Sequence, residues 1–284
     1  MPELPEVETI VRSLQNPKEW LLAEGQSMRE RPGVIGRQIS SAALHWERTL
    51  AVPTPAEFLQ HIAGQTIQNV SRRGKFIVLT LDDEVLLFHL RMSGDLRVEG
   101  QSAPVQTHDR LILNFHDDLR LVFNDTRKFG RAWLVKDAQT VLSGLGPEPL
   151  ELTISGAALY KRWHASSRAI KTLLLDQSIL AGVGNIYSDE ALFLAGIHPL
   201  SAGKALSIED CDRLLSAVRT VLQKGIENNG ASIDWVYRGG DFQNHFKVYQ
   251  RTGEACEVCG SPIQRLVIGQ RSSHFCPVCQ PNKY

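Results

Sequence analysis

The sequence of 284 residues has few of the features that mark a specialised class of protein. No apolar run approaches the ~18 residues of a membrane span, so we expect no contact with a membrane. Basic and acidic residues number 31 each, so the chain is not coated in positive charge and any nucleic-acid site must be local. Internal repeats are absent as well. With 43% hydrophobic residues, the chain has the composition of an ordinary globular protein.

An export signal is also missing. Glu3, Glu6 and Glu8 stand where a secretory signal would be basic and then apolar. We therefore expect the protein in the cytoplasm or on the nucleoid. Cysteine is scarce before the last thirty residues, which hold four of the five. The fifth, Cys211, falls in a helical pattern and is expected to be a buried, small apolar residue.

The apolar pattern predicts an α+β fold in three domains. Residues 1–150 should form an N-terminal helix, Pro5 to Leu14, followed by antiparallel strands that form a β-sandwich or, as the turn pattern also allows, a barrel. A cluster of glycine and proline at 144–149 ends this domain. A helical domain at 151–247 should follow, and a zinc-ribbon-like β-hairpin at 248–284 should end the chain.

The predicted elements can be given by residue. The strands of the sandwich are Phe76 to Leu81, Val85 to Leu90, Asp95 to Val98, Arg110 to Phe115, Arg120 to Phe123 and Arg131 to Val135. The later helices are Ala157 to Trp163, Ala169 to Leu174, Ile186 to Ala195 and Ile208 to Lys224. Residues 16 to 36 mix glycine, proline and charge, which predicts a loop or insertion with at most one short helix, Lys18 to Ala23.

The four late cysteines have the spacing of a metal site. Cys256 and Cys259 form one Cys-x2-Cys pair, and Cys276 and Cys279 form a second pair after sixteen intervening residues. Each pair can supply two thiolates to one tetrahedral zinc ion, and four protein ligands leave no open position for catalysis. We therefore predict one structural zinc ion.

Two segments between the cysteine pairs predict a β-hairpin, Arg265 to Ile268 and Ser273 to Phe275. Its turn would hold residues 269–272 and project Arg271 from a rigid tip. An arginine in an exposed loop is more often a solvated charge than a binding residue. A role for Arg271 therefore needs support from elsewhere in the chain.

The N-terminus offers an unusual nucleophile. A small residue after Met1 favours removal of the methionine, which would expose the secondary amine of Pro2. An α-amino group with a pKa near ~7.7–8.0 is partly unprotonated at neutral pH, and secondary amines form iminium ions with sugar aldehydes. Glu3 lies beside the amine and Glu6 one helical turn later, so two carboxylates could manage protons there. Taken alone, an acidic helix start is explained by the helix dipole.

These two ends of the chain, with the motifs between them, resemble the formamidopyrimidine-DNA glycosylase family. In order, the motifs are Pro2 to Glu6, Arg73 to Phe76, His89 to Gly94, Asn124 to Gly130, Asp176 to Glu190 and Gly269 to Arg271. The family removes oxidised purines such as 8-oxoguanine from DNA and then nicks the strand, in base excision repair. The resemblance spans essentially the whole chain. It implies a bifunctional DNA glycosylase and AP lyase that binds damaged double-stranded DNA as a monomer.

The resemblance assigns the chemistry to the N-terminus and two basic residues. Pro2 would attack the sugar C1′ and expel the base, forming a Schiff base from which β- and δ-elimination cut both sides of the nucleotide. Glu3 would protonate the ring oxygen and later shuttle protons, while Glu6 would orient the site. Lys75 would contact the phosphate and lesion region, and Arg271 would grip the same strand.

The resemblance also implies how the duplex is held while the damaged base is flipped out. A flipped base leaves a hole, at a cost of a few kcal/mol. Met92, Arg127 and Phe129 would enter the duplex to fill it, with Arg127 reading the orphaned cytosine. Residues 177–187 match a helix-two-turn-helix, whose backbone amides approach phosphate at a helix start.

Three further DNA-binding residues follow from the same motifs. Asn185 would bind phosphate at the helix start, and His89 and Lys171 are additional candidates. Arg91 and Thr126 depart from residues common in the family, but neither touches the proposed chemistry.

Two other interpretations remain open. One is the related endonuclease branch, which prefers oxidised pyrimidines; Leu4 and the duplex-filling residues favour the purine branch instead. The other is a catalytically silent, zinc-containing DNA-binding module, which the combination of Pro2, Glu3 and Lys75 argues against. The segment 232–246 falls where the family places its lesion-capping loop, without assignable contacts. The sequence leaves the ranking of lesions open.

Overall fold

The structure of the chain, a computed structural model, describes residues 1–15, 32–232 and 239–282. Most of the predicted insertion at 16 to 36, including the helix Lys18 to Ala23, lies outside the described residues, as do residues 233–238 of the 232–246 loop. Inter-residue contacts divide the chain into two units. The first is Met1–Ser143 with Asn229–Gly240, and the second is Gly144–Asn228 with Asp241–Tyr284. The three-domain division at 150 and 247 stays a prediction.

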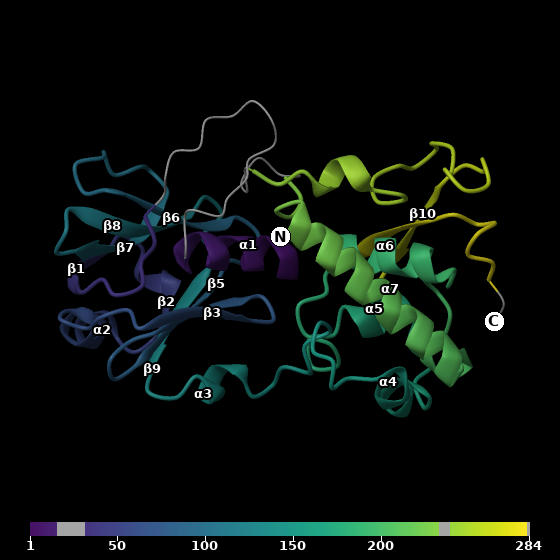
Figure 1. The fold of residues 1–284 in the computed structure, drawn as a ribbon, viewed down its shortest axis with the longest axis horizontal. Coiled ribbons are helices and arrows are strands. Elements are labelled where there is room, and N and C mark those ends of the chain that lie inside the picture. The colour runs from purple at the N-terminus through teal and green to yellow at the C-terminus, as the bar shows by residue number, and fades with distance from the viewer. Residues whose placement is uncertain (16–31, 233–238, 283–284) are drawn as a thin grey trace. The chain divides into compact units, whose positions relative to one another are not determined.

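The first unit contains one long helix, two sheets and short helices (Figure 1). The four-stranded sheet has the order β1-β7-β8-β6, and the five-stranded sheet has the order β2-β9-β5-β4-β3. Its helices are α1 (Leu4–Gln15), α2 (Pro55–Ile62), α3 (Gln139–Leu142) and the 3-10 turn η2 (Glu47–Thr49). Its strands are β1 (Ile39–Leu44), β2 (Leu50–Val52), β3 (Asn69–Arg73), β4 (Phe76–Thr80), β5 (Val85–His89), β6 (Gly94–Gly100), β7 (Asp109–Phe115), β8 (Leu119–Asp125) and β9 (Arg131–Val135).

The helix α1 is built into the core of this unit. Its apolar face, which includes Val7 and Val11, is buried in one cluster with side chains of both sheets. The helix packs against β3 and β4, and the β3 residue Arg72 donates a hydrogen bond to Glu8, with Nε 3.0 Å from Oε2. This packing fixes the position from which the N-terminus begins.

The sequence predicted most of this unit and missed part of it. All six predicted strands are confirmed to within two residues as β4 to β9. The strands β1 to β3 were not predicted, because their sequences contain many small or charged residues and few of the aromatic and β-branched residues that favour strands. The helix α2 was missed too, although Thr54 and Glu57 form a capping box at its start. One pairing, β2 with β9, is parallel.

The second unit is helical and ends in a β-hairpin (Figure 1). Its elements are α4 (Gly156–Trp163), α5 (Ile170–Leu174), α6 (Asn185–Ala195), η3 (Gly203–Ala205), α7 (Ile208–Glu227), η4 (Phe242–His245), β10 (Gln264–Ile268) and β11 (Arg271–Phe275). The four predicted helices are confirmed as α4 to α7. The helix α6 lies at the centre, because it packs against α5, α7 and β11.

Two details of this unit follow from simple chemistry. The helix α7 starts at a capping box in which Ser207 and Asp210 exchange hydrogen bonds with each other's backbone N–H groups. Cys211, on α7, has no exposed surface, which confirms the prediction of a buried thiol. Burial raises the pKa of this thiol to about 12, so it is unreactive. No helix among the described residues is both long enough and apolar enough to cross a membrane.

Candidate functional site

The start of α1 is held by a carboxylate of its own first turn. Pro2 is buried, and Glu3 and Glu6 are each only 2% exposed. One oxygen of Glu6 accepts the backbone N–H of Glu3 at 2.8 Å, and the other accepts the backbone N–H of Ala231 at 2.7 Å. Gly230 passes so close that a Cβ there would lie 2.7 Å from Glu6. Glu6 therefore fixes the backbone that carries Pro2 and Glu3.

Lys75 lies in the turn between β3 and β4, and His89 is the last residue of β5, the strand that pairs with β4. Lys75 is 5% exposed and follows Gly74, which has a φ of 57° in the tight turn between β3 and β4. The ring of His89 meets that of Phe76 edge to face, with centroids 4.8 Å apart. Its Nδ1 accepts the backbone N–H of Arg91 at 3.0 Å. The imidazole can therefore carry its proton on Nε2 and donate a hydrogen bond from there.

The environment keeps His89 neutral. Burial lowers its pKa to about 3, and the positive charges of Arg91 and Lys75 add to the effect. A contact from His89 to DNA would thus be a hydrogen bond from a neutral ring, and the positive charge in this region belongs to Arg91 and Lys75.

The three residues predicted to enter the duplex lie on two turns. Met92 is half-buried in the turn between β5 and β6, whereas Arg127 and Phe129 are exposed in the turn between β8 and β9. Half of the Phe129 surface is exposed, and the guanidinium carbon of Arg127 lies 5.5 Å from the centre of its ring. Phe129 and Arg127 are both exposed on one turn, so their side chains are available for insertion into a base stack.

A buried carboxylate joins these two turns. Asp125, 1% exposed, accepts the backbone N–H of Gly130 at 2.7 Å and that of Arg127 at 3.2 Å. The hydroxyl of Ser93 donates to the same carboxylate and accepts the N–H of Arg127 at 3.0 Å. Sequence reasoning missed Ser93 and Asp125, because the pairing of β6 with β8 that brings them together is not visible in either motif.

The predicted helix-two-turn-helix leads into the start of α6. Its glycine-rich loop is shaped by Gln177, whose amide accepts the N–H of Gly182 at 2.9 Å and donates to the carbonyl of Val183 at 2.9 Å. Gly184 is the N-cap, and Asn185 is the first residue of the helix. The Asn185 side-chain oxygen is buried without a hydrogen-bond partner in the described structure. This is the positive end of the helix dipole, where anions are stabilised.

The structure corrects one predicted DNA contact. Lys171 has no exposed surface, and its ammonium group donates to the carboxylate of Asp189 at 2.6 Å and to the backbone carbonyl of Asn185 at 2.9 Å. Lys171 is therefore not placed to bind phosphate. The resemblance made Lys171 an additional phosphate candidate, but on α5 its side chain is buried against α6.

Arg271 is exposed at the start of β11 and not inside the turn. The turn consists of Gly269 and Gln270 alone, with φ values of 55° and 64°, and Ile268 pairs with Arg271 across it. Two residues at positive φ are typical of a type I′ hairpin turn. The tip is thus shorter and more rigid than the predicted turn of residues 269–272.

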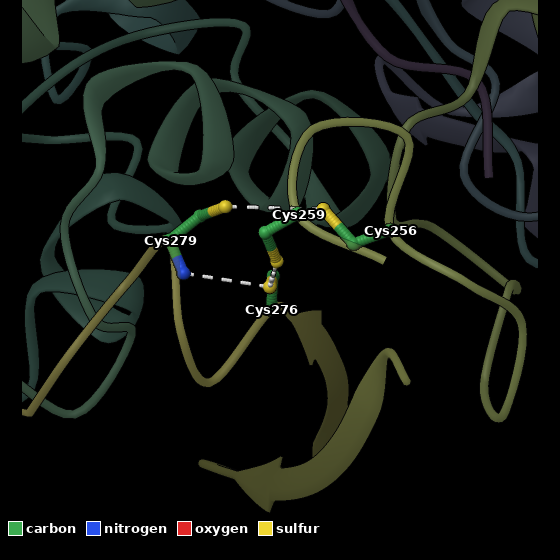
Figure 2. A group of neighbouring side chains, drawn as sticks. All are labelled: Cys256, Cys259, Cys276 and Cys279. Carbon is green, nitrogen blue, oxygen red and sulfur yellow. Dashed lines mark hydrogen bonds between the residues drawn. The ribbon is translucent and has the colours of Figure 1, made fainter. Parts of the chain in front are cut away.

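The four cysteines converge in the way a single metal ion requires (Figure 2). All four sulfurs lie within 4.8 Å of one another. Sγ of Cys256 is 3.8 Å from that of Cys279, and Sγ of Cys259 is 3.4 Å from that of Cys276. Tetrahedral zinc with Zn–S bonds of ~2.3 Å places its sulfurs roughly 3.8 Å apart. The geometry fits one zinc ion with four thiolate ligands, as predicted.

The predicted residues fall into two sets. The first unit holds Pro2, Glu3, Glu6, Lys75, His89, Met92, Arg127 and Phe129, and the second holds Lys171, Asn185, Arg271 and the four cysteines. Within each unit the structure brings residues from distant parts of the sequence together.

Comparisons with known proteins agree with this arrangement. Three family models match: the formamidopyrimidine-DNA glycosylase N-terminal domain at residues 1–132, the formamidopyrimidine-DNA glycosylase H2TH domain at 145–236, and a zinc finger found in FPG and IleRS at 253–282. A formamidopyrimidine-DNA glycosylase of Chloroflexus aurantiacus is 44% identical, over 99% of this chain and 98% of the relative.

Solved structures match over the whole fold. Wild-type Lactococcus lactis Fpg (MutM), bound to DNA containing N7-benzyl-Fapy-dG, has a TM-score of 0.88 and 36% identity and covers 99% of this chain and 100% of its own. MutM in complex with DNA containing carbocyclic 8-oxo-G has a TM-score of 0.87 and 35% identity, with the same coverage.

Proposed function

Because this chain belongs to the formamidopyrimidine-DNA glycosylase family, we propose that it excises oxidised purines from double-stranded DNA and then cleaves the abasic strand. The relative carries the name of that glycosylase, and the matching structures hold DNA with 8-oxo-G and Fapy-dG lesions. The chain is thus a bifunctional DNA glycosylase and AP lyase of base excision repair. Ring-oxidised and ring-opened guanine are its expected substrates.

The observation that carries the proposal is the double hydrogen bond of Glu6. It holds the backbone of Glu3 and of Ala231, so residues 2 and 3 start from a fixed point in a buried setting. A nucleophile in an ordinary frayed N-terminus would lose the benefit of orientation, which is worth several kcal/mol in well-aligned reactions. Here that orientation is built into the first turn of α1.

The proposed chemistry starts once Met1 has been removed. The lone pair of the Pro2 nitrogen attacks C1′, the bond between C1′ and the base breaks, and the base leaves with a proton. Glu3 protonates the ring oxygen of the sugar, which opens to an iminium ion on Pro2. Loss of a C2′ proton expels the 3′ phosphate, and loss of the C4′ proton then expels the 5′ phosphate, so that both sides of the nucleotide are cut. Water then releases Pro2.

The remaining residues hold the DNA. We propose that Lys75 and His89 contact phosphate beside the nucleophile, Lys75 as a cation and His89 as a neutral donor. Met92, Arg127 and Phe129 fill the space of the flipped nucleotide. These few local contacts reconcile DNA binding with a net charge of zero.

The second unit would grip the DNA strand through Asn185 and Arg271. The zinc ion would be held by Cys256, Cys259, Cys276 and Cys279, and it would supply rigidity to the hairpin. Its four thiolate ligands leave no place for a substrate atom.

Trapping with borohydride tests the proposal directly. Reduction should join the protein covalently to DNA containing 8-oxoguanine or an abasic site, and peptide mass mapping should place the bond on Pro2. The matched control is the same chain with an uncleaved N-terminal extension, in which the Pro2 nitrogen is an amide and no adduct should form. An adduct on the extended chain, or on another residue, would point to a different nucleophile.

Two broader proposals need their own measurements. We propose that the protein is a monomer, because its duplex-filling turns and its zinc hairpin all come from one chain. Sedimentation of the free protein and of its DNA complex tests this, and a two-to-one complex would contradict it. We also propose a cytoplasmic location, which fractionation of the producing cell would check.

A further inference from the structure

One buried carboxylate in the second unit connects three elements. Asp189, in the middle of α6, has no exposed surface. Its Oδ1 accepts from Lys171 on α5 at 2.6 Å and from the hydroxyl of Ser273 on β11 at 2.7 Å. Its Oδ2 accepts the backbone N–H of His274 at 2.9 Å and lies 3.1 Å from the Nδ1 of the same residue. Neither the zinc centre nor the proposed chemistry uses Asp189.

The helix side of this network ends at Asn185. The ammonium group of Lys171 bonds to Asp189 and also donates to the backbone carbonyl of Asn185 at 2.9 Å. The buried cation therefore sits under the first turn of α6 and holds the residue whose side chain is proposed to bind phosphate.

The hairpin side of the network ends at Arg271. Ser273 and Arg271 are two residues apart on β11, so their side chains leave the ribbon on the same face. The bond from Ser273 to Asp189 fixes that face of the strand against α6. Because the turn has only two residues and Ile268 pairs with Arg271 across it, β11 is held in register with β10 up to Arg271. The position of Arg271 is therefore tied to α6 through a single carboxylate.

The free energy of a buried ion pair suggests that this pair positions other residues and adds little to the stability of the fold. A buried salt bridge contributes little net stability, because the desolvation of two charges offsets their attraction, and apolar residues of similar size often do as well. The neighbouring Glu190 offers a contrast. Its carboxylate accepts the backbone N–H groups of residues 247, 248 and 249, a segment that carries none of the proposed DNA contacts.

We propose that Asp189, paired with Lys171, is a positioning residue that sets the separation of Asn185 and Arg271 to match two phosphates of one DNA strand. The proposal rests on the proposed function of those two residues. A preset separation lowers the cost of ordering them when DNA binds, so Asp189 acts on affinity and not on the chemical step.

A double-mutant cycle between Asp189→Asn and Arg271→Ala tests this coupling. The probe is a duplex with a tetrahydrofuran abasic-site analogue, which binds without being cleaved. Asp189→Asn should weaken binding roughly tenfold, the size of effect seen for residues that orient others. In the Arg271→Ala background the same change should weaken binding by less than about threefold, because the residue it positions is gone. The single-turnover rate on 8-oxoguanine DNA at saturating enzyme should stay within about twofold.

Ser273→Ala provides a second test that leaves the buried charges paired. It removes one bond between β11 and Asp189 and should weaken binding about threefold, with zinc content unchanged and the melting temperature lowered by only ~2–4 °C. If Asp189→Asn loses zinc or fails to fold, Ser273→Ala in the same cycle decides the question.

The outcomes distinguish the positioning role of Asp189 from the phosphate contacts on which it depends. Equal losses with and without Arg271, or no loss in a folded variant that retains its zinc, would overturn the positioning role. If Arg271→Ala and Asn185→Ala leave affinity unchanged, the proposed phosphate contacts fail, and the positioning role fails with them.

Discussion

A histidine that stays neutral is an economical DNA contact, because it donates a hydrogen bond without a charge that must be desolvated. The pKa of His89 is lowered to about 3 by burial and by the charges of Arg91 and Lys75. In the unfolded chain the pKa returns to ~6.5. Between these values the unfolded state binds a proton that the folded state does not, so the free energy of unfolding must fall as pH falls below about 6.5.

The variant His89→Asn tests this, since its side-chain oxygen can still accept the N–H of Arg91. The wild type should lose up to ~1.4 kcal/mol more per pH unit than the variant between about pH 6 and pH 4. Urea unfolding at several pH values measures the difference. Parallel stability curves would mean that His89 is protonated in the folded state.

Glu3 is the residue with the sharpest predicted separation between binding and chemistry. The variant Glu3→Gln keeps the backbone N–H that Glu6 accepts but cannot give up a proton. The single-turnover rate of excision should fall by ~100-fold or more, the usual contribution of a general acid, with the affinity for lesion DNA nearly unchanged. A variant that keeps the wild-type rate would assign the proton transfer to another group.

At the scale of elements, the two duplex-filling turns behave as one piece. Asp125 holds the turn of Arg127 and Phe129 from inside, and Ser93 links it to the turn of Met92. Two separate loops would each lose conformational entropy on binding DNA. Two turns that are already held together by Asp125 and Ser93 lose that entropy during folding instead.

The variant Asp125→Asn replaces one acceptor oxygen by an amide nitrogen and so disrupts the hydrogen bonds that hold the two turns together. Affinity for lesion duplex should fall roughly tenfold, while affinity for undamaged duplex changes little, because undamaged DNA presents no hole to fill. Competition binding with the two duplexes measures the ratio, and Ser93→Ala should show a smaller loss. Equal losses on both duplexes would indicate a general effect on the fold.

The elements show what could be predicted from the sequence. Local patterns identified α1, α4 to α7 and the six strands β4 to β9, because apolar periodicity and turn residues are signals that come from residues close together in the sequence. The Cys-x2-Cys pairs and the Pro2 motif were equally local. The network around Lys171 and Asp189 could not be predicted from local patterns, because it includes Ser273, which lies 84 positions after Asp189. A charged residue in the apolar stretch of α6 was the one available signal.

At the scale of the whole molecule, affinity for DNA should depend on a small number of cations. The net charge is zero, so we expect counterion release to come from the two cations proposed to contact phosphate, Lys75 and Arg271, and not from a general basic surface. The slope of log K against log salt should be about −2, at roughly −0.9 for each phosphate neutralised. The variant Arg271→Ala should reduce the slope by about one. A much steeper wild-type slope would reveal a further basic surface.

Zinc should matter to one unit and not to the other. The four thiolates belong to the second unit. Removing zinc with a chelator, or introducing Cys276→Ser, should weaken DNA binding through loss of the hairpin that carries Arg271. Hydrogen exchange should show lost protection in β10 and β11 and unchanged protection in β4 and β5. The variant Cys211→Ala is the matched control, with zinc and affinity retained.

The bond between Glu6 and Ala231 also sets an order of events during synthesis. The two residues are 225 positions apart, so the second hydrogen bond of the Glu6 carboxylate cannot form until most of the chain has been made. Until then the Glu6 carboxylate holds only the backbone N–H of Glu3, and we expect the first residues to be more accessible to the enzyme that trims the initiator methionine. Once Ala231 docks, Pro2 is buried. We therefore expect Met1 to be removed, and the Pro2 amine exposed, in the interval between the emergence of the N-terminus and the arrival of residue 231.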